Sequence, residues 1–349
     1  FPFLIIATPF LFSIYFHFFL HCKQPKSSTH SRLILSSRGH RIEKESSNSP
    51  TGSRSWVSPE SPARPLLLLS FLSSPSHAFG WDRGSFSFGA PAVDEVEVAL
   101  CNEAIDHHAD QINERVGDLS LSSDSSTLQG ITGRGDLGGL LGWDPPWRDP
   151  FRSMLCHPRL VPYLHAILGK GYRLDHNAGL ISMRKGTEGH TFHGSSGPGF
   201  DPNQYYIWQN GRMHNGLTVV AWQLADVNPG DGGLIVIPGS HKGNVSCPTP
   251  IRKWEAHHDI VKHVTCKAGD VVIFTEAVTH GTIPWSADHD RRSVLFRMSP
   301  GNLAYATGYN PWPESMLEGL TPQQRAVLEP PYHQRLQRPV LDDDGTLAG

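Results

Sequence analysis

The chain has 349 residues and 38% hydrophobic content, which is enough for one sizeable folded core plus a tail. Its formal net charge of −3 gives no sign of the excess of basic residues that nucleic-acid binding needs. With 34 glycines and 28 prolines the sequence is rich in turns, as all-β proteins with long loops are. The five cysteines are widely spaced and form no Cys-x-x-Cys pair, which argues against a zinc knuckle or a disulfide framework.

Residues 1–78 differ in composition from the rest of the chain. Phe1–Leu20 is almost continuously apolar and long enough to cross a bilayer as a helix, and residues 65–72 form a second apolar run that ends near small residues typical of a signal-peptide cleavage site. No methionine precedes Met154, so translated non-native sequence, a signal anchor and an organelle-targeting leader all stay open. We expect the folded domain at residues 79–349, membrane contact only if the leader is genuine, and no assignable cellular location.

Two stretches ahead of the central region have the periodicity of helices. Between Val93 and Ile112 apolar residues recur among acidic residues and histidines, which predicts an amphipathic helix packed outside a sheet. Asp149–Leu168 carries a wide apolar stripe, and we expect a helix there that breaks near Pro158 and ends at Gly169. The Ser- and Gly-rich sequence between these two stretches is expected to form a long loop.

Short apolar segments separated by turn residues follow. One strand is expected to run into Met183, and a second, over residues 232–237, stops at a Pro-Gly turn that leads to Ser240-His241-Lys242. A turn at residues 268–270 precedes Val271–Phe274. This run is too short and too rich in β-branched residues for a helix and predicts a buried strand.

The strand over residues 271–274 would deliver His280 to a surface, and the next strand would bring back Arg291. Gly281 beside the histidine would let a ligand approach the backbone, whereas Arg292 would point to the opposite face of its strand. An arginine side chain is a fork of donors that matches a carboxylate. The spacing therefore predicts a metal ligand beside a carboxylate clamp; the alternative is a histidine bonded to a carbonyl and an arginine on a solvated strand.

These motifs together resemble the phytanoyl-CoA dioxygenase family of non-haem iron, 2-oxoglutarate-dependent oxygenases. The resemblance covers roughly Asp149 to Tyr305, and it rests on the order and spacing of Gly232-Gly233, the Pro-Gly-Ser-His-Lys turn, His280-Gly-Thr and Arg291. It implies an all-β core with flanking helices, namely a double-stranded β-helix or jelly roll. It also implies an enzyme that uses Fe(II), 2-oxoglutarate and O2 to hydroxylate a small organic or lipid-like substrate, which the sequence does not identify.

The resemblance assigns roles to individual residues. His193 and His280 would hold the iron, and Arg291 would grip the far carboxylate of 2-oxoglutarate, a task for which lysine is a poor substitute. Thr282 would contact the same carboxylate. The side chains of His241-Lys242 belong to the family's signature turn and are expected to fix a loop at the rim rather than to bind metal.

The third metal ligand is where this chain departs from the family pattern. The family writes its first two ligands as His-x-Asp, and the corresponding residues here are His193-Gly194-Ser195. Asp201, the nearest downstream carboxylate, could reach the metal if its loop folds back, whereas Glu188 is less favoured and His190 does not repair the motif. Three interpretations follow. A carboxylate from elsewhere could complete the metal site of a hydroxylase, or the metal position left without a carboxylate could bind chloride, as in related halogenases. In the third interpretation the domain is a non-catalytic binding module.

Beyond the core, Thr321 is expected to cap a short helix that begins at Pro322. The C-terminal tail would clasp the barrel rather than carry chemistry. A small-molecule substrate is the expected partner, and the oligomeric state cannot be read from the sequence.

Overall fold

The computed structural model describes residues 92–349 except 118–119, 123, 195–199, 244 and 306–307. The expected leader at residues 1–78, with both of its apolar runs, lies outside the described residues. Within the described part of the chain, no helix has the length and apolar character needed to cross a membrane.

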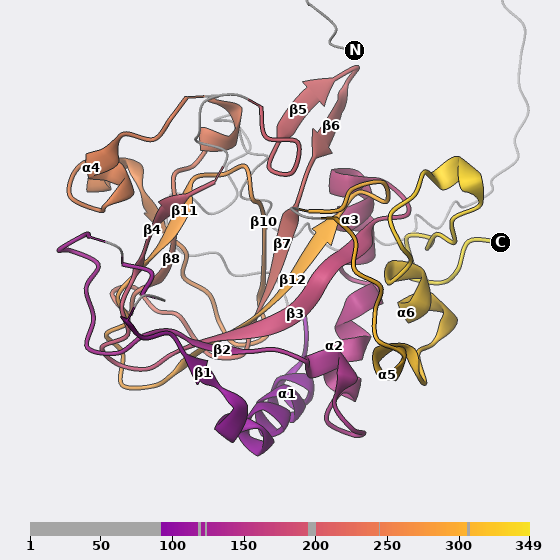
Figure 1. Ribbon diagram of the computed structural model, residues 1–349, viewed down its shortest axis with the longest axis horizontal. Coiled ribbons are helices and arrows are strands. Elements are labelled where there is room, and N and C mark those ends of the chain that lie inside the picture. Colours follow the sequence, from indigo (N-terminus) through magenta and orange to yellow (C-terminus); the bar gives the residue numbers. More distant parts are fainter. Residues whose placement is uncertain (1–91, 118–119, 123, 195–199, 244, 306–307) are drawn as a thin grey trace, which may run out of the picture. The chain divides into compact units, whose positions relative to one another are not determined.

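Two antiparallel sheets form the centre of the fold (Figure 1). The larger sheet has the order β1 (Asn113–Glu114), β2 (Gly135–Leu137), β3 (Arg173–Met183), β12 (Arg291–Ser299), β7 (Thr218–Gln223) and β10 (Val271–Thr275). The smaller sheet has the order β4 (His190–His193), β11 (His280–Ile283), β8 (Gly233–Val236) and β9 (Lys262–His263). A separate hairpin consists of β5 (Tyr206–Gln209) and β6 (Arg212–Asn215). This architecture is the predicted all-β jelly roll with flanking helices.

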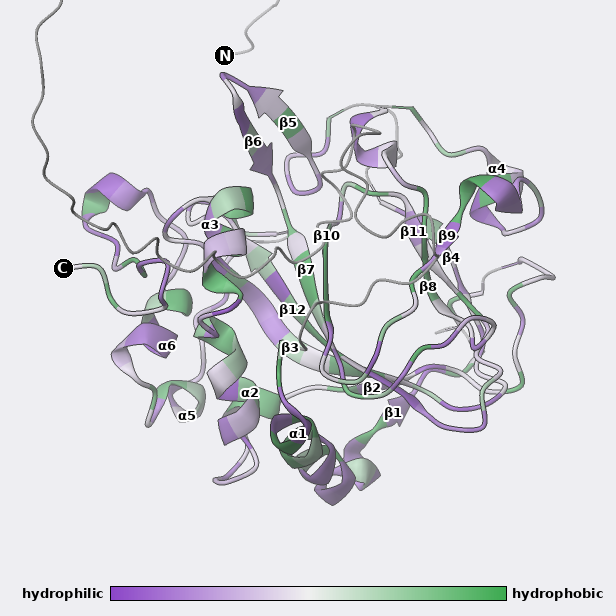
Figure 2. Ribbon diagram, turned by 180° about the vertical axis from the view of Figure 1, so that it is seen from behind, coloured by the Kyte–Doolittle hydropathy of each residue, from purple (hydrophilic) through white to green (hydrophobic). Residues whose placement is uncertain are grey.

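The strands β7, β10 and β12 of the larger sheet are buried on both faces, because alternate residues belong to two different cores. On β12, Val294, Phe296 and Met298 pack in the core that includes the helices, whereas Leu295 faces the smaller sheet. Figure 2 shows β10 as an almost wholly hydrophobic strand. Burial on both sides explains why the sequence over β10 is a continuous apolar run instead of an alternating one.

Helices cover the outer face of the larger sheet (Figure 1). The helix α1 (Glu95–His107) begins at Asp94, whose side chain accepts hydrogen bonds from the backbone of Val96 and Glu97. The interrupted helix expected over residues 149–168 is confirmed as α2 (Asp149–Ser153), a 3-10 turn, and α3 (Val161–Leu168), which ends at Gly169.

The remaining helices are short. The α-helices are α4 (Thr249–Arg252), α5 (Glu314–Leu317) and α6 (Pro322–Val327), and Thr321 caps α6 as predicted. The 3-10 helices are η3 (Ala109–Gln111), η5 (Leu140–Gly142), η6 (Met154–Cys156), η7 (Ser240–Lys242), η8 (His258–Ile260) and η9 (Gln334–Leu336).

The stretch expected to be one long loop before Asp149 contains an ordered edge of the larger sheet. The strand β2 pairs with β3, with Leu137 opposite Leu180, and Leu137 is buried. A three-residue strand among glycines carries too few apolar residues to be recognised from its sequence, since its pairing depends on the distant β3.

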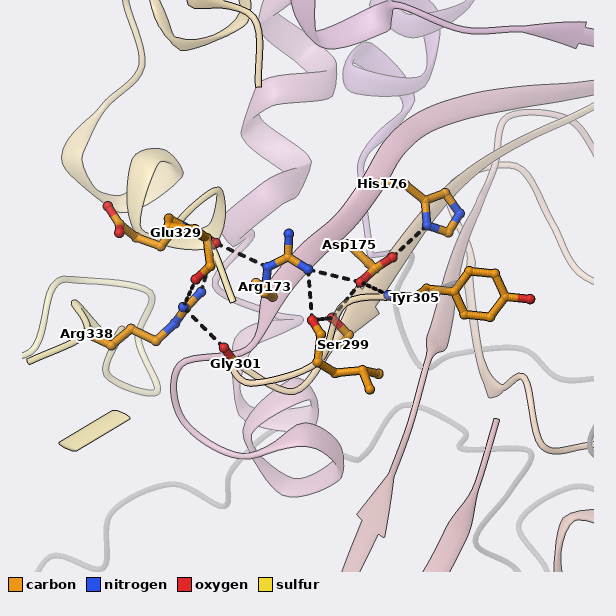
Figure 3. A network of polar contacts seen from close by, with 10 residues as sticks. Arg173, Asp175, His176, Ser299, Gly301, Tyr305, Glu329 and Arg338 are labelled. Carbon is orange, nitrogen blue, oxygen red and sulfur yellow. Dashed lines mark hydrogen bonds and ion pairs between the residues drawn. The ribbon is translucent and has the colours of Figure 1, made fainter. Parts of the chain in front are cut away.

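A buried polar network holds the C-terminal tail against the sheet (Figure 3). Arg173 at the start of β3 is fully buried, forms an ion pair with Asp175 at 3.0 Å, and donates to the carbonyl groups of Leu303 and Glu329. Arg338 from the tail donates to the same Glu329 carbonyl. The predicted clasp is therefore present, and it is centred on one buried ion pair.

The carboxylate of Asp175 holds its charge inside this network. Burial raises its pKa, but a hydrogen bond with His176, the charge of Arg173 and the backbone N–H of Tyr305 outweigh burial and bring the pKa below its usual value. The folded state therefore favours the ionised carboxylate.

Substituting Asp175→Asn should lower the free energy of unfolding by about 3 kcal/mol at pH 7, because Arg173 is then buried without a counter-charge. Denaturant unfolding measures this change. The contribution of a carboxylate with a depressed pKa is present above its unfolded pKa, about 4, and is lost as the pH falls through its folded value, so the difference between the variants should shrink in acid. The control Asp288→Asn, in an exposed ion pair with Lys185, should leave stability unchanged. Equal effects of the two substitutions would contradict this account.

Candidate metal centre

The two predicted metal histidines lie side by side on neighbouring strands of the smaller sheet. His193 ends β4, His280 begins β11, and the two are direct partners in the strand register, with ring centroids 4.1 Å apart. The Nδ1 atom of His193 lies 3.0 Å from the carbonyl oxygen of Thr191, and that of His280 lies 2.8 Å from the carbonyl oxygen of Val278. When Nδ1–H donates to a carbonyl, the lone pair is left on Nε2. Both rings are thus oriented as metal ligands.

Burial keeps these imidazoles neutral. It is the main cause that lowers the pKa of both His193 and His280, and for His193 the neighbouring His280 lowers the pKa further. His190 lies beside His193 with ring centroids 4.3 Å apart, and burial lowers its pKa to about 3. A neutral imidazole is the form that binds a metal ion, so no proton has to be displaced from either ligand at neutral pH.

A carboxylate outside the family pattern completes the group. Glu276 directly follows β10, and its Oε2 atom lies 3.8 Å from Nε2 of His280. One ligand atom from each of His193, Glu276 and His280 lies within 4.8 Å of the others, and no further cluster of this kind occurs among the described residues. Two histidines and a carboxylate on one face form the ligand set of non-haem iron. Ser195, at the family's carboxylate position, lies outside the described residues.

A tight turn brings Glu276 to the histidines. The N–H of Val278 donates to the carbonyl of Thr275 at 3.0 Å, and the N–H of Glu276 donates to the carbonyl of Leu217 at 2.9 Å. The chain passes here from β10 in the larger sheet to β11 in the smaller one. Glu276 at the start of the turn and His280 just after it therefore lie at the same end of the barrel. The only sequence signal was a carboxylate four residues before the distal histidine.

The carboxylates considered from the sequence are not brought to this cluster. Asp201 accepts hydrogen bonds from the backbone N–H groups of Asn203 at 2.7 Å and Gln204 at 3.3 Å, so it caps a turn. Glu188 accepts a hydrogen bond from the backbone N–H of Leu121 at 2.7 Å and thereby holds the loop around Leu121 in place. Each of the two side chains already has a local structural role.

The cluster lines a cavity of about 220 Å³ between the two sheets. Its apolar wall comes from the inner faces of the strands and includes Val219, Ala221, Leu234, Phe274 and Leu295. Thr282 and Arg291, the residues predicted to hold 2-oxoglutarate, line the same cavity. A larger hollow of about 750 Å³ lies between α3, the β5–β6 hairpin and the tail, and none of the predicted site residues lines it.

Arg291 lies in this cavity without a carboxylate partner among the described residues. Its side chain is almost wholly buried, its Nη1 atom is 3.5 Å from the sulfur of Met183, and its Nε atom has no hydrogen bond. Burial lowers the pKa of Arg291 to about 10, so the guanidinium is charged at neutral pH. A buried charge without a counter-charge is costly. A carboxylate bound in the cavity would supply both the charge and the missing hydrogen bonds.

Two glycines leave space for groups that pack closely against them. Gly233 has φ +89°, and a Cβ atom there would lie 3.1 Å from Nε of Arg291, so glycine leaves space for the guanidinium. At Gly281 a Cβ atom would lie 2.8 Å from the carbonyl oxygen of His190 on β4. The space at Gly281 is thus taken by the adjacent strand. The close approach of β4 is thus sufficient reason for a glycine at this position, and the approach of a ligand to Gly281 stays a prediction.

The Pro-Gly-Ser-His-Lys turn supports the strand that carries His280. The Oγ atom of Ser240 accepts the N–H of Thr279 at 2.7 Å, and the N–H of Ile237 donates to the carbonyl of Thr279 at 2.9 Å. His241 is buried with its ring edge-on to Tyr206. These contacts agree with the expectation that the signature turn fixes a loop at the rim.

Comparison with known proteins bears on the same region. The sequence model of the family "Phytanoyl-CoA dioxygenase (PhyH)" matches residues 144–293. Among curated proteins, none matches this sequence. HygX from Streptomyces hygroscopicus, crystallised with nickel and 2-oxoglutarate, is similar in structure with a TM-score of 0.50 and 17% identity, covering 63% of this chain and 84% of HygX.

Two further structures are more distant. AviO1 from Streptomyces viridochromogenes Tue57 has a TM-score of 0.42 and 16% identity over 64% of this chain and 90% of its own. SnoN, a non-haem 2-oxoglutarate-dependent epimerase from nogalamycin biosynthesis, has a TM-score of 0.42 and 18% identity over 64% and 86%. The family match runs from α2 to the start of β12 and identifies a phytanoyl-CoA dioxygenase domain in this part of the chain, which indicates activity of the iron- and 2-oxoglutarate-dependent oxygenase type.

Proposed function

We propose that this protein is an Fe(II)- and 2-oxoglutarate-dependent dioxygenase that hydroxylates a small organic substrate. The observation that carries the proposal is the convergence of two histidines and the Glu276 carboxylate in the cavity that also holds Arg291, which has no carboxylate partner among the described residues. A divalent metal and a dicarboxylate would satisfy both features at once. HygX, which has a similar fold, was crystallised with nickel and 2-oxoglutarate.

Each side chain in the cavity has a definite task under this proposal. His193, His280 and Glu276 would hold the iron, and Arg291 with Thr282 would hold the far carboxylate of 2-oxoglutarate. Once bound, iron and 2-oxoglutarate supply the activation of O2 that the protein alone cannot perform. The protein orients the ligand rings through backbone carbonyls, and its apolar wall excludes water and positions the substrate.

Glu276 also bears on the three interpretations left open by Ser195. A halogenase needs a vacant position at the metal for chloride, and a non-catalytic module has no need of three converging ligands. In this chain a carboxylate oxygen stands 3.8 Å from Nε2 of the distal histidine. The arrangement therefore favours a hydroxylase.

Removing Glu276 should weaken iron binding. Titration with iron(II) and 2-oxoglutarate without oxygen, followed by the visible charge-transfer absorption of the chelate, should give a band in the native protein. His193→Ala should abolish the band, and Glu276→Gln should raise the iron concentration needed by at least about tenfold, since even indirect supports of a metal ligand carry 10–100-fold effects. Asp201→Asn is the matched control and should keep native affinity. Native affinity in Glu276→Gln, with a loss in Asp201→Asn, would reverse the ligand assignment.

Chloride distinguishes the hydroxylase from the halogenase. Adding chloride to the protein loaded with iron(II) and 2-oxoglutarate should leave the absorption band unchanged, because Glu276 occupies the position that chloride would take. Glu276→Ala opens that position, so its residual band should shift with chloride. A chloride-dependent shift in the native protein would sink the hydroxylase assignment.

Arg291→Met should stabilise the protein in the absence of ligand. Removing a buried charge that lacks a counter-charge should raise the free energy of unfolding by roughly 1–3 kcal/mol. The same substitution should eliminate the rise in melting temperature that 2-oxoglutarate gives to the iron-loaded native protein. Arg291→Lys keeps the charge and should show weakened 2-oxoglutarate binding without the gain in stability. If Arg291→Met still responds to 2-oxoglutarate like the native protein, Arg291 is not the clamp.

A further inference from the structure

The cavity holds more positive charge than iron and 2-oxoglutarate require. Arginines at four positions line it, whereas Glu276 is the only carboxylate among its described lining residues. The four are Arg115, Arg134, Arg291 and Arg297. Arg115 and Arg134 both bond to one further carboxylate, Asp136 on β2.

The excess of positive charge in the cavity remains when iron(II) and 2-oxoglutarate are bound. Four guanidinium groups line the cavity, and the carboxylates of Glu276 and Asp136 balance two of them, so the arginines outnumber these carboxylates by two. Iron(II) and the 2-oxoglutarate dianion add no net charge when they bind together. The loaded cavity therefore still attracts an anion, and attraction is strong where water is excluded.

Arg297 is the arginine placed to receive that anion. Residues alternate along β12, so Arg291, Leu295 and Arg297 face the cavity, while Phe296 packs in the outer core. Arg292 illustrates the alternation, because its side chain points to the opposite face of β12, as predicted, and forms hydrogen bonds with α1.

The strand register sets Arg297 at the level of the metal cluster. Arg297 pairs with Val219, which pairs with Phe274, and the Phe274 ring lies 4.8 Å from that of His280. Arg291 is six residues away on the same strand, so the two Cα atoms are about 20 Å apart. Arg291 and Arg297 thus flank different parts of the cavity.

The side chain of Arg297 has no hydrogen-bond or ion-pair partner among the described residues, although Arg297 is partly buried and faces inward. An arginine in such a place binds carboxylate or phosphate groups through paired N–H donors. We propose that the substrate oxidised beside the metal carries an anionic group, a carboxylate or a phosphate, which Arg297 binds. This inference rests on the proposed function, since it takes the metal cluster as the reacting centre.

The test uses the full chain loaded with iron(II) and 2-oxoglutarate without oxygen, in native form and as Arg297→Gln, Arg297→Lys and Arg292→Gln. First, the chelate band gives the affinity for 2-oxoglutarate, which should be native in all three variants. Second, calorimetric titration compares three probes of similar size: phenylacetate, phenyl phosphate and the neutral phenylacetamide. The two anions separate a carboxylate site from a phosphate site.

At least one anionic probe should bind the native protein about tenfold or more tighter than phenylacetamide, the effect of a charge-assisted pair. Arg297→Gln should lose this preference, Arg297→Lys should keep part of it, and Arg292→Gln on the opposite face should keep all of it.

Three results would overturn the proposal. The native protein could bind the anions no better than the amide, or not at all. Arg297→Gln could lose affinity for 2-oxoglutarate, which would assign Arg297 to the co-substrate. Absence of the chelate band in the native protein would instead defeat the proposed function, and this inference with it.

Discussion

Burial between the two sheets is the constraint on which the candidate site depends. It lowers the pKa of His193 and His280 so that both rings are neutral, and it leaves the charged Arg291 buried without a carboxylate partner among the described residues. Under the proposed function, the same loss of solvent would prepare two ligands for a cation and one clamp for an anion. Their coexistence in one small cavity is the physical reason to regard it as a binding site.

The fold meets this constraint through strand register and one turn. Pairing of β4 with β11 sets the two histidines opposite each other, and the turn after β10 adds Glu276 from the end of the larger sheet. The alternation along β12 supplies cavity-facing arginines on a strand whose other face packs against the helices. Outside the barrel, the buried pair of Arg173 and Asp175 fastens the tail without entering the cavity.

The sequence predicted those residues of the candidate site that follow a linear motif, and it did not predict features that depend on how distant strands pair or face each other. His193, His280, Arg291 and Thr282 follow a linear motif, and all four line one cavity. Glu276 could not be recognised, because its approach to His193 depends on how the two sheets face each other. The strand β2 was missed because its pairing depends on the distant β3. Asp201 was considered for its nearness in sequence, but its carboxylate is bonded to the backbone of its own turn.

Diffraction from crystals grown with iron(II) and 2-oxoglutarate without oxygen, measured at the iron absorption edge, tests the central claim most directly. The account predicts one anomalous peak bonded to Nε2 of His193, Nε2 of His280 and the carboxylate of Glu276, with 2-oxoglutarate extending from it to Arg291. A peak held by Asp201 or by the two histidines alone, with Glu276 turned away, would contradict it.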